Sequence, residues 1–232
     1  MNEDTDISDA KYRLPALLSF LALFIGTAIA ACLIKYVPSR NALLRLLFSL
    51  LPIQGFCFAA MLISLTPLWR HYGLKTTFNS PGKMPSLREC IVHIAITLLV
   101  LYPAITLVTL PATWLCKRLG LPIIEQTFAI LPPDASPLHI VLLVFAGFVM
   151  APLTEELLMR LILYRTIRSL WQTGAPCLTA AIFAIIHGCP QYTPGLFLVG
   201  LALHLAQKKG GLPLSIILHA AFNAISLAML NI

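Results

Sequence analysis

The chain has 232 residues, of which 59% are hydrophobic and only 11% charged, with a net charge of +7 and a mean hydropathy of +0.88. A soluble globular domain has about 25% charged residues, so this composition excludes an ordinary soluble protein and predicts helices that lie in a lipid bilayer. The basic residues fall mostly in short connections between apolar runs, which is typical of membrane orientation and headgroup contact and excludes a soluble surface for nucleic acid.

Seven apolar runs follow one another along the chain, and we expect an all-α, polytopic transmembrane bundle of about seven to eight helices. The runs cover residues 14–34, 43–68, 90–115, 138–158, 176–188, 193–206 and 212–230. The last three are short or interrupted by Pro and Gly, which makes their ends the least sharply marked. The first run is too long for the apolar part of a cleaved signal peptide, so we expect it to be retained.

Three regions follow from this order. Residues 1–13 form a polar, acidic tail, residues 14–137 hold the N-terminal helices and loops, and residues 138–232 form a core that carries the unusual polar residues. The loop at 69–89 is polar, whereas the loop at 117–137 is Pro-rich and half apolar. We expect this second loop to lie in the membrane interface or to act as a lid.

The basic residues also predict an orientation, with the N-terminus in the cytoplasm and the C-terminus outside. With seven spans, 11 of the 16 basic residues then lie inside: Lys11, Arg13, Arg70, Lys75, Lys83, Arg88, Arg160, Arg165, Arg168, Lys208 and Lys209. The other five lie outside: Lys35, Arg40, Arg45, Lys117 and Arg118.

The segment APLTEELLMR (151–160) places two adjacent glutamates and an arginine inside an apolar run. Glu156 and Arg160 are four residues apart, so on a helix they share one face, while Glu155 lies about 100° round the helix. We therefore expect the arginine to hold one carboxylate while the other faces a different group. A solvated helix end is the simpler alternative, but the flanking residues 157–162 are otherwise apolar, and ionisable groups in such settings are usually functional.

Two further polar groups stand in apolar runs. FAIIH (183–187) ends in His187, and HAAFN (219–223) places His219 and Asn223 on one helix face. Each group alone is also explained as a structural hydrogen bond between membrane helices. Three such groups on three apolar helices, with almost nothing else polar, indicate one shared site.

These residue types suit hydrolysis. A carboxylate and an imidazole can share a water molecule and take its proton, and a second histidine with an asparagine can donate hydrogen bonds to a developing oxyanion. The set predicts attack of water on an amide without a covalent intermediate.

Two alternatives stay open. His187, His219 and a glutamate could bind zinc, although HExxH is absent and the six cysteines show no metal-binding spacing. In the second alternative the protein is not an enzyme, but an immunity or scaffold protein, or a small transporter that uses Glu155 as a proton relay.

In this order, EExxxR, FxxxH and HxxxN resemble the motifs of the CPBP family, which comprises CAAX proteases and bacteriocin-processing enzymes and is also called the Abi family. The resemblance covers about residues 138–232 and includes the Gly-rich turn in GGLPLSIILHAAFN (210–223). The family is viewed as intramembrane glutamic endopeptidases. The resemblance implies a role for each of six residues: Glu155 as the general base, His187 sharing the water, Glu156 and Arg160 as a supporting ion pair, and His219 and Asn223 as the oxyanion hole.

One departure concerns the substrate. The family commonly has the sequence FRG around its arginine, whereas this chain has Met159-Arg160-Leu161. Leucine in place of glycine makes the helix face beside the site bulkier. Relatives cleave prenylated C-terminal tails, act in bacteriocin maturation and self-immunity, or process C-terminal anchoring tails. We expect a membrane-embedded or lipid-anchored peptide substrate, no cofactor, and a place in the bacterial inner (cytoplasmic) membrane.

Overall fold

The computed structural model describes residues 9–37, 42–78, 85–123 and 136–230, and the regular elements in these ranges are all helical. The all-α membrane bundle is therefore confirmed. The expected lid at 117–137 falls largely on residues 124–135, which lie outside the described residues, as do residues 1–8 of the expected tail.

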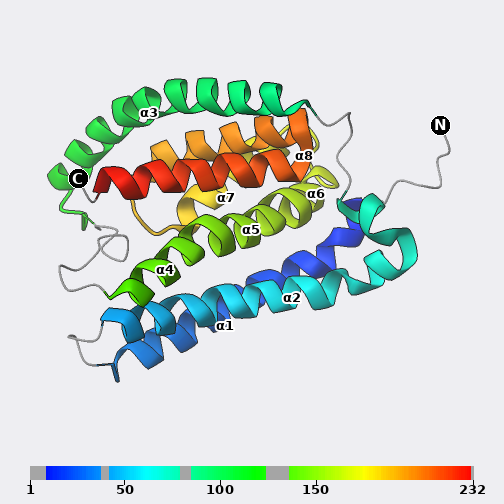
Figure 1. Cartoon of the computed structure of the whole chain (residues 1–232), viewed down its shortest axis with the longest axis horizontal. Coiled ribbons are helices and arrows are strands. Elements are labelled where there is room, and N and C mark those ends of the chain that lie inside the picture. Colours follow the sequence, from blue (N-terminus) through cyan, green and yellow to red (C-terminus); the bar gives the residue numbers. More distant parts are fainter. Residues whose placement is uncertain (1–8, 38–41, 79–84, 124–135, 231–232) are drawn as a thin grey trace.

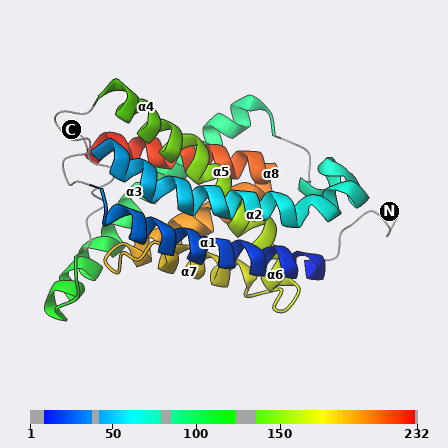
Figure 2. The ribbon, with the colours of Figure 1, turned by 90° about the horizontal axis from the view of Figure 1, so that it is seen from below.

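Three long helices form the first half of the chain. They are α1 (Arg13–Ile34), α2 (Ala42–Phe78) and α3 (Leu87–Arg118). Helices α1 and α2 pack along each other (Figure 1, Figure 2). A Cβ at Gly26 would stand only 2.6 Å from the Pro52 carbonyl oxygen, so this glycine is what lets the two backbones approach so closely. Helix α2 continues ten residues beyond the apolar run that predicts it, because the polar stretch after residue 68 stays helical.

The second half contains one long, composite helix and two further elements. The composite helix runs from Pro137 to Arg168 through α4 (Pro137–Phe145), η4 (Ala146–Met150), α5 (Ala151–Glu156), η5 (Leu157–Leu163) and α6 (Tyr164–Arg168). Then follow α7 (Ala175–Ile186) and α8 (Thr193–Leu230). Segments η4 and η5 are π-helical, and they bracket the short α-helix that carries both glutamates.

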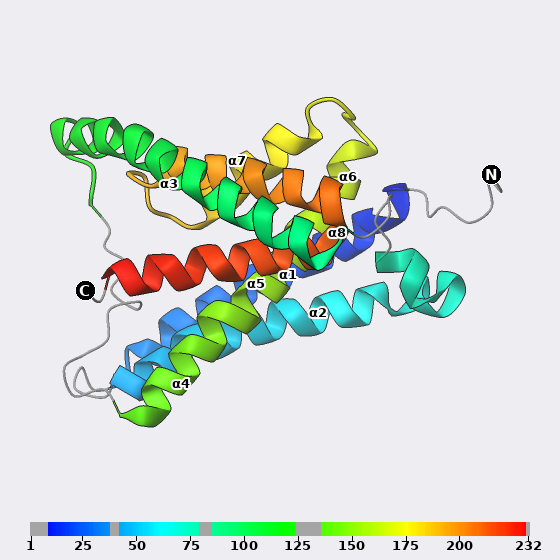
Figure 3. The same cartoon turned by 45° about the horizontal axis from the view of Figure 1, so that its top comes forward.

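Helix α8 is bent back on itself. Gly210 and Gly211 have non-helical backbone angles, and Gly211 has a φ of 72°, which favours glycine. The Ser215 hydroxyl lies 3.0 Å from the Leu203 carbonyl oxygen, although twelve residues of straight helix would separate them by about 18 Å. The two halves of α8 therefore lie side by side (Figure 3).

The helix count is slightly below the expected seven to eight. Among the described residues, five helices are long and apolar enough to cross a membrane, and α7 is a shorter apolar helix. Two features explain the difference. The apolar runs at 193–206 and 212–230 form the two halves of α8, which join at Gly210–Gly211 and are counted as one element. Helix α7 has only 12 residues, which span about 18 Å of a hydrocarbon core roughly 30 Å thick.

Several basic side chains tie helix ends together at one end of the bundle, where the Gly210–Gly211 turn also lies (Figure 3). Lys11 contacts the Tyr72 hydroxyl. Arg13 donates a hydrogen bond of 3.3 Å to Ser169, and the Lys209 ammonium lies 3.4 Å from His93. The start of α1 therefore contacts the end of α6, and the start of α3 contacts the middle of α8.

Candidate active site

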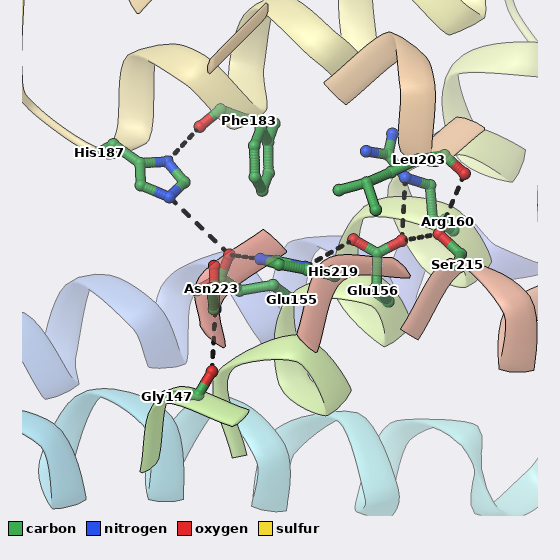
Figure 4. Close-up of polar contacts among 10 residues, drawn as sticks. All are labelled: Gly147, Glu155, Glu156, Arg160, Phe183, His187, Leu203, Ser215, His219 and Asn223. Carbon is green, nitrogen blue, oxygen red and sulfur yellow. Dashed lines mark hydrogen bonds and ion pairs between the residues drawn. The ribbon is translucent and has the colours of Figure 1, made fainter. Parts of the chain in front are cut away.

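The polar residues of the second half converge in the interior of the bundle (Figure 4). Three parts of the chain supply them: the consecutive segments α5 and η5, the end of α7, and the second half of α8. The side chains that meet there are Glu155, Glu156, Arg160, His187, Ser215, His219 and Asn223.

Glu156 is wholly buried, and every group around its carboxylate donates to it. Arg160 Nε lies 3.2 Å from Glu156 Oε2, as the i,i+4 spacing predicts. His219 Nδ1 lies 3.1 Å from Glu156 Oε1, and the Ser215 hydroxyl also contacts the carboxylate. A buried charge needs a partner and further hydrogen bonds, and this carboxylate has both, which makes it a structural anion.

Arg160 is also fully buried. Its guanidinium carbon lies 5.8 Å from the centre of the Phe183 ring, and its backbone carbonyl accepts a hydrogen bond from Gln207. Among the described residues, Nη1 and Nη2 have no hydrogen-bond partner, so Glu156 is the one anionic contact of the arginine there.

His219 stands between the two carboxylates. A carboxylate can only accept, so His219 Nδ1 carries the hydrogen that is donated to Glu156. On the other side of the ring, Nε2 lies 3.8 Å from Glu155 Oε2. Glu156 thus fixes both the tautomer and the direction of an imidazole that faces Glu155.

His187 faces the same oxygen from α7. Its Nδ1 lies 2.6 Å from the Phe183 carbonyl, and since a carbonyl only accepts, Nδ1 carries the hydrogen. In the neutral ring, Nε2 is then an acceptor, and it lies 3.9 Å from Glu155 Oε2. Phe183 also packs its ring against both histidines, at 4.7 Å from His187 and 5.9 Å from His219.

Glu155 is the partly exposed member of the pair. Its side chain keeps 28% of its surface accessible, whereas Glu156 has 0%. Among the described residues, Glu155 Oε2 has no hydrogen-bond partner. Its separations of 3.8 and 3.9 Å from the two histidines exceed a direct hydrogen bond of about 3.2 Å and suit a bridge through one water molecule.

Asn223 completes the site from the second half of α8. Its amide nitrogen donates a hydrogen bond of 2.9 Å to the Gly147 carbonyl in η4. The amide nitrogen has two hydrogens, so one holds the side chain while the other is available to a second acceptor.

All six residues expected from the sequence lie in this cluster, and two further residues join it. Ser215 lies one helical turn before His219 on the same face, and that spacing is a signal that could have revealed it. Gln207 sits in a polar stretch at the end of an apolar run, where nothing in the pattern marks it. Among the described residues, no group of three His, Cys, Asp or Glu side chains is placed to hold a metal ion, so the zinc alternative has no ligand set there.

The apolar spans indicate an integral membrane protein, and two carboxylates and two imidazoles meet inside its bundle. Residues 137–225 match the family described as Type II CAAX prenyl endopeptidase Rce1-like, and this match supports the resemblance to the CPBP family of CAAX proteases. No curated protein and no solved structure matches the chain. The match, together with the apolar helices, supports a membrane protease of the CAAX type.

Proposed function

We propose that the protein is an intramembrane endopeptidase of the glutamic type, in which Glu155 activates the attacking water. One observation carries this proposal. The Glu155 side chain is partly exposed, and its buried Oε2 lies between the Nε2 atoms of His187 and His219, at distances that one water molecule can bridge. The neighbouring Glu156 is buried and fully engaged, so it is not available as a base.

The first step follows from the hydrogen-bonding capacity of these groups. Both the Glu155 carboxylate and the neutral His187 Nε2 accept hydrogen bonds, so a water between them donates one hydrogen to each and directs its lone pair away from both. As the water oxygen bonds to the peptide carbonyl carbon, Glu155 takes one proton. Glu155 then gives this proton to the peptide nitrogen as the carbon–nitrogen bond breaks.

The oxyanion of the tetrahedral intermediate needs donors. Asn223 has one amide hydrogen left after its bond to Gly147. His219 can donate from Nε2 only when both ring nitrogens carry a proton, because Nδ1 already serves Glu156. We assign the oxyanion hole to these two side chains, with Glu156, Arg160 and Ser215 as the support that orients His219.

The substrate class that fits is a membrane-embedded or lipid-anchored peptide, such as a C-terminal tail that carries a prenyl group or resembles a bacteriocin. The support comes from the family match and from a site built inside apolar spans. The side chains of Met159 and Leu161, on either side of Arg160, are buried, so the bulk that replaces the family's usual glycine packs inside the bundle.

We further propose that the basic end of the bundle faces the cytoplasm, in a bacterial inner membrane. Lys11, Arg13 and Lys209 all lie at this end, and positive residues are retained on the cytoplasmic side. The chain then has its N-terminus inside and its C-terminus outside.

The experiment compares cells that produce either the wild-type protein or Glu155→Gln at equal levels. The C-terminal peptides of their membrane proteins are measured by mass spectrometry. A defined tail that is lost only with the wild type supports proteolysis and identifies the substrate. Identical peptide sets, together with an unchanged cellular phenotype in Glu155→Gln, contradict the proposal.

A further inference from the structure

The composite helix that carries both glutamates widens just before them. In η4, the Ala151 N–H bonds to the Ala146 carbonyl, five residues back instead of four. Pro152 is the adjacent residue and is buried. A proline ring inside a helix clashes with the carbonyl four residues before it, and a π-helical turn relieves that clash by widening the backbone.

The same proline leaves one carbonyl without a partner inside the helix. In the π-helical register, the Gly147 carbonyl would accept from the N–H of residue 152, but proline has none. In the α-helical register it would accept from Ala151, whose N–H already serves Ala146. A carbonyl in an apolar bundle needs a donor from elsewhere.

That donor is the side chain of Asn223, whose amide nitrogen lies 2.9 Å from the Gly147 oxygen. Because a carbonyl only accepts, this contact determines which end of the amide faces η4 and which way the Asn223 oxygen points. Gly147, Glu155 and Asn223 are drawn together in Figure 4. The partner that fixes Asn223 therefore comes from the helix that also carries Glu155.

We propose that Pro152 is a positioning residue for Asn223. By withholding an N–H, it keeps the Gly147 carbonyl free as a fixed acceptor, which holds the Asn223 amide with its second hydrogen toward the reacting carbonyl. The catalytic consequence rests on the proposed function, whereas the positioning itself does not.

The decisive variant is Pro152→Ala, which restores the N–H. The Gly147 carbonyl then gains a donor within its own helix and shares its lone pairs, so the bond to Asn223 weakens. We expect kcat to fall roughly tenfold to a hundredfold with KM within about twofold, which is less than the loss of 10² to 10³ that accompanies complete removal of an oxyanion donor. The control is Pro111→Ala in α3, an exposed proline inside a helix, which should keep wild-type kinetics.

A double-mutant cycle separates positioning from a general structural effect. If Pro152 acts through Asn223, Pro152→Ala causes little further loss in an Asn223→Ala background. Equal, additive losses in the two backgrounds overturn the proposal. If Asn223→Ala itself cleaves like the wild type, the assignment of Asn223 in the proposed function fails instead.

A readout that needs no substrate tests the positioning directly. In protein labelled with ¹⁵N at asparagine, the side-chain amide of Asn223 is assigned by its disappearance in Asn223→Ala. We expect it to exchange its hydrogens slowly in the wild type and at least several-fold faster in Pro152→Ala. If Pro152→Ala does not fold, fast exchange of the Asn223 amide hydrogens in the wild type still overturns the proposal. Pro152→Ser also restores the backbone N–H, so slow exchange in the wild type together with unchanged cleavage by Pro152→Ser overturns it as well.

Discussion

Glu155 and Glu156 are consecutive in the chain, yet they occupy opposite environments on the two sides of His219. Glu156 Oε1 lies 3.1 Å from Nδ1 of that ring and is wholly buried, while Glu155 Oε2 lies 3.8 Å from Nε2 and belongs to a side chain that is 28% exposed. A rotation of about 100° between adjacent helical residues produces this division. One carboxylate supports the imidazole, and the other is the one that we propose to activate water.

This difference in burial predicts that replacing a glutamate by glutamine lowers stability strongly at position 156 and hardly at all at position 155. Glu156→Gln leaves Arg160 as a buried, uncompensated charge, and we expect it to lower the free energy of unfolding by about 3–5 kcal/mol. Glu155→Gln should leave stability within about 0.5 kcal/mol, because the contacts of that carboxylate to His187 and His219 are both longer than 3.5 Å. Thermal unfolding of both variants in the same detergent measures the difference. Equal losses in both variants would contradict the assignment.

The ion pair can also be tested from its cationic side. Arg160→Ala leaves Glu156 buried without its arginine, and we expect a destabilisation of about 3–5 kcal/mol. The control is Arg118→Ala, since Arg118 is exposed at the end of α3 and contacts the Trp114 ring. If Arg160→Ala expresses and melts like the control, the pair is solvated and the buried site described above is wrong.

Ser215 offers a milder perturbation of the same support. Its hydroxyl contacts both the Glu156 carboxylate and the Leu203 carbonyl. Ser215→Ala should lower stability by about 1–3 kcal/mol, since hydrogen bonds to buried charged groups are worth roughly that much. The matched control is Ser64→Ala in α2, whose hydroxyl donates a hydrogen bond to the Met61 carbonyl within its own helix. No difference between the two variants would remove Ser215 from the site.

A chelator distinguishes the glutamic mechanism from the zinc alternative. Among the described residues, no set of three side chains is placed to hold a metal ion, and the proposed chemistry assigns no step to a metal ion. We expect the rate of cleavage by purified protein to change less than about twofold after prolonged incubation with a strong chelator. Loss of activity that added zinc restores would favour the metalloprotease instead.

The sequence predicted the parts of the fold and site that depend on local pattern. Apolar runs marked the spans, and i,i+4 spacing gave the Glu156–Arg160 pair, which the structure places at 3.2 Å. The three polar motifs were expected to share one site, and the structure brings their side chains together. Their catalytic roles stay predictions that the variants above test.

Other features of the fold depend on contacts between distant parts of the chain, and the sequence pattern contains no clear signal for them. Both π-helical segments were missed. Pro152 follows η4, but a proline inside an apolar run is equally compatible with a kink or a helix end, and η5 contains no proline that could mark it. The contact between Asn223 and Gly147 spans 76 residues and requires the bent α8 to pack beside η4. The division of α8 at Gly210 was visible in the sequence, but the closeness of its two halves, shown by Ser215 and Leu203, was not.

The most direct test of the central claim measures peptide cleavage by purified protein, using the tail identified in cells as substrate. Wild type, Glu155→Gln and the control Arg118→Ala are compared at equal concentration after their folding has been verified by thermal unfolding. The account predicts that Glu155→Gln retains the fold and loses at least about a thousandfold in kcat/KM, because the base that activates water is gone. A folded Glu155→Gln protein that cleaves within tenfold of wild type would contradict it.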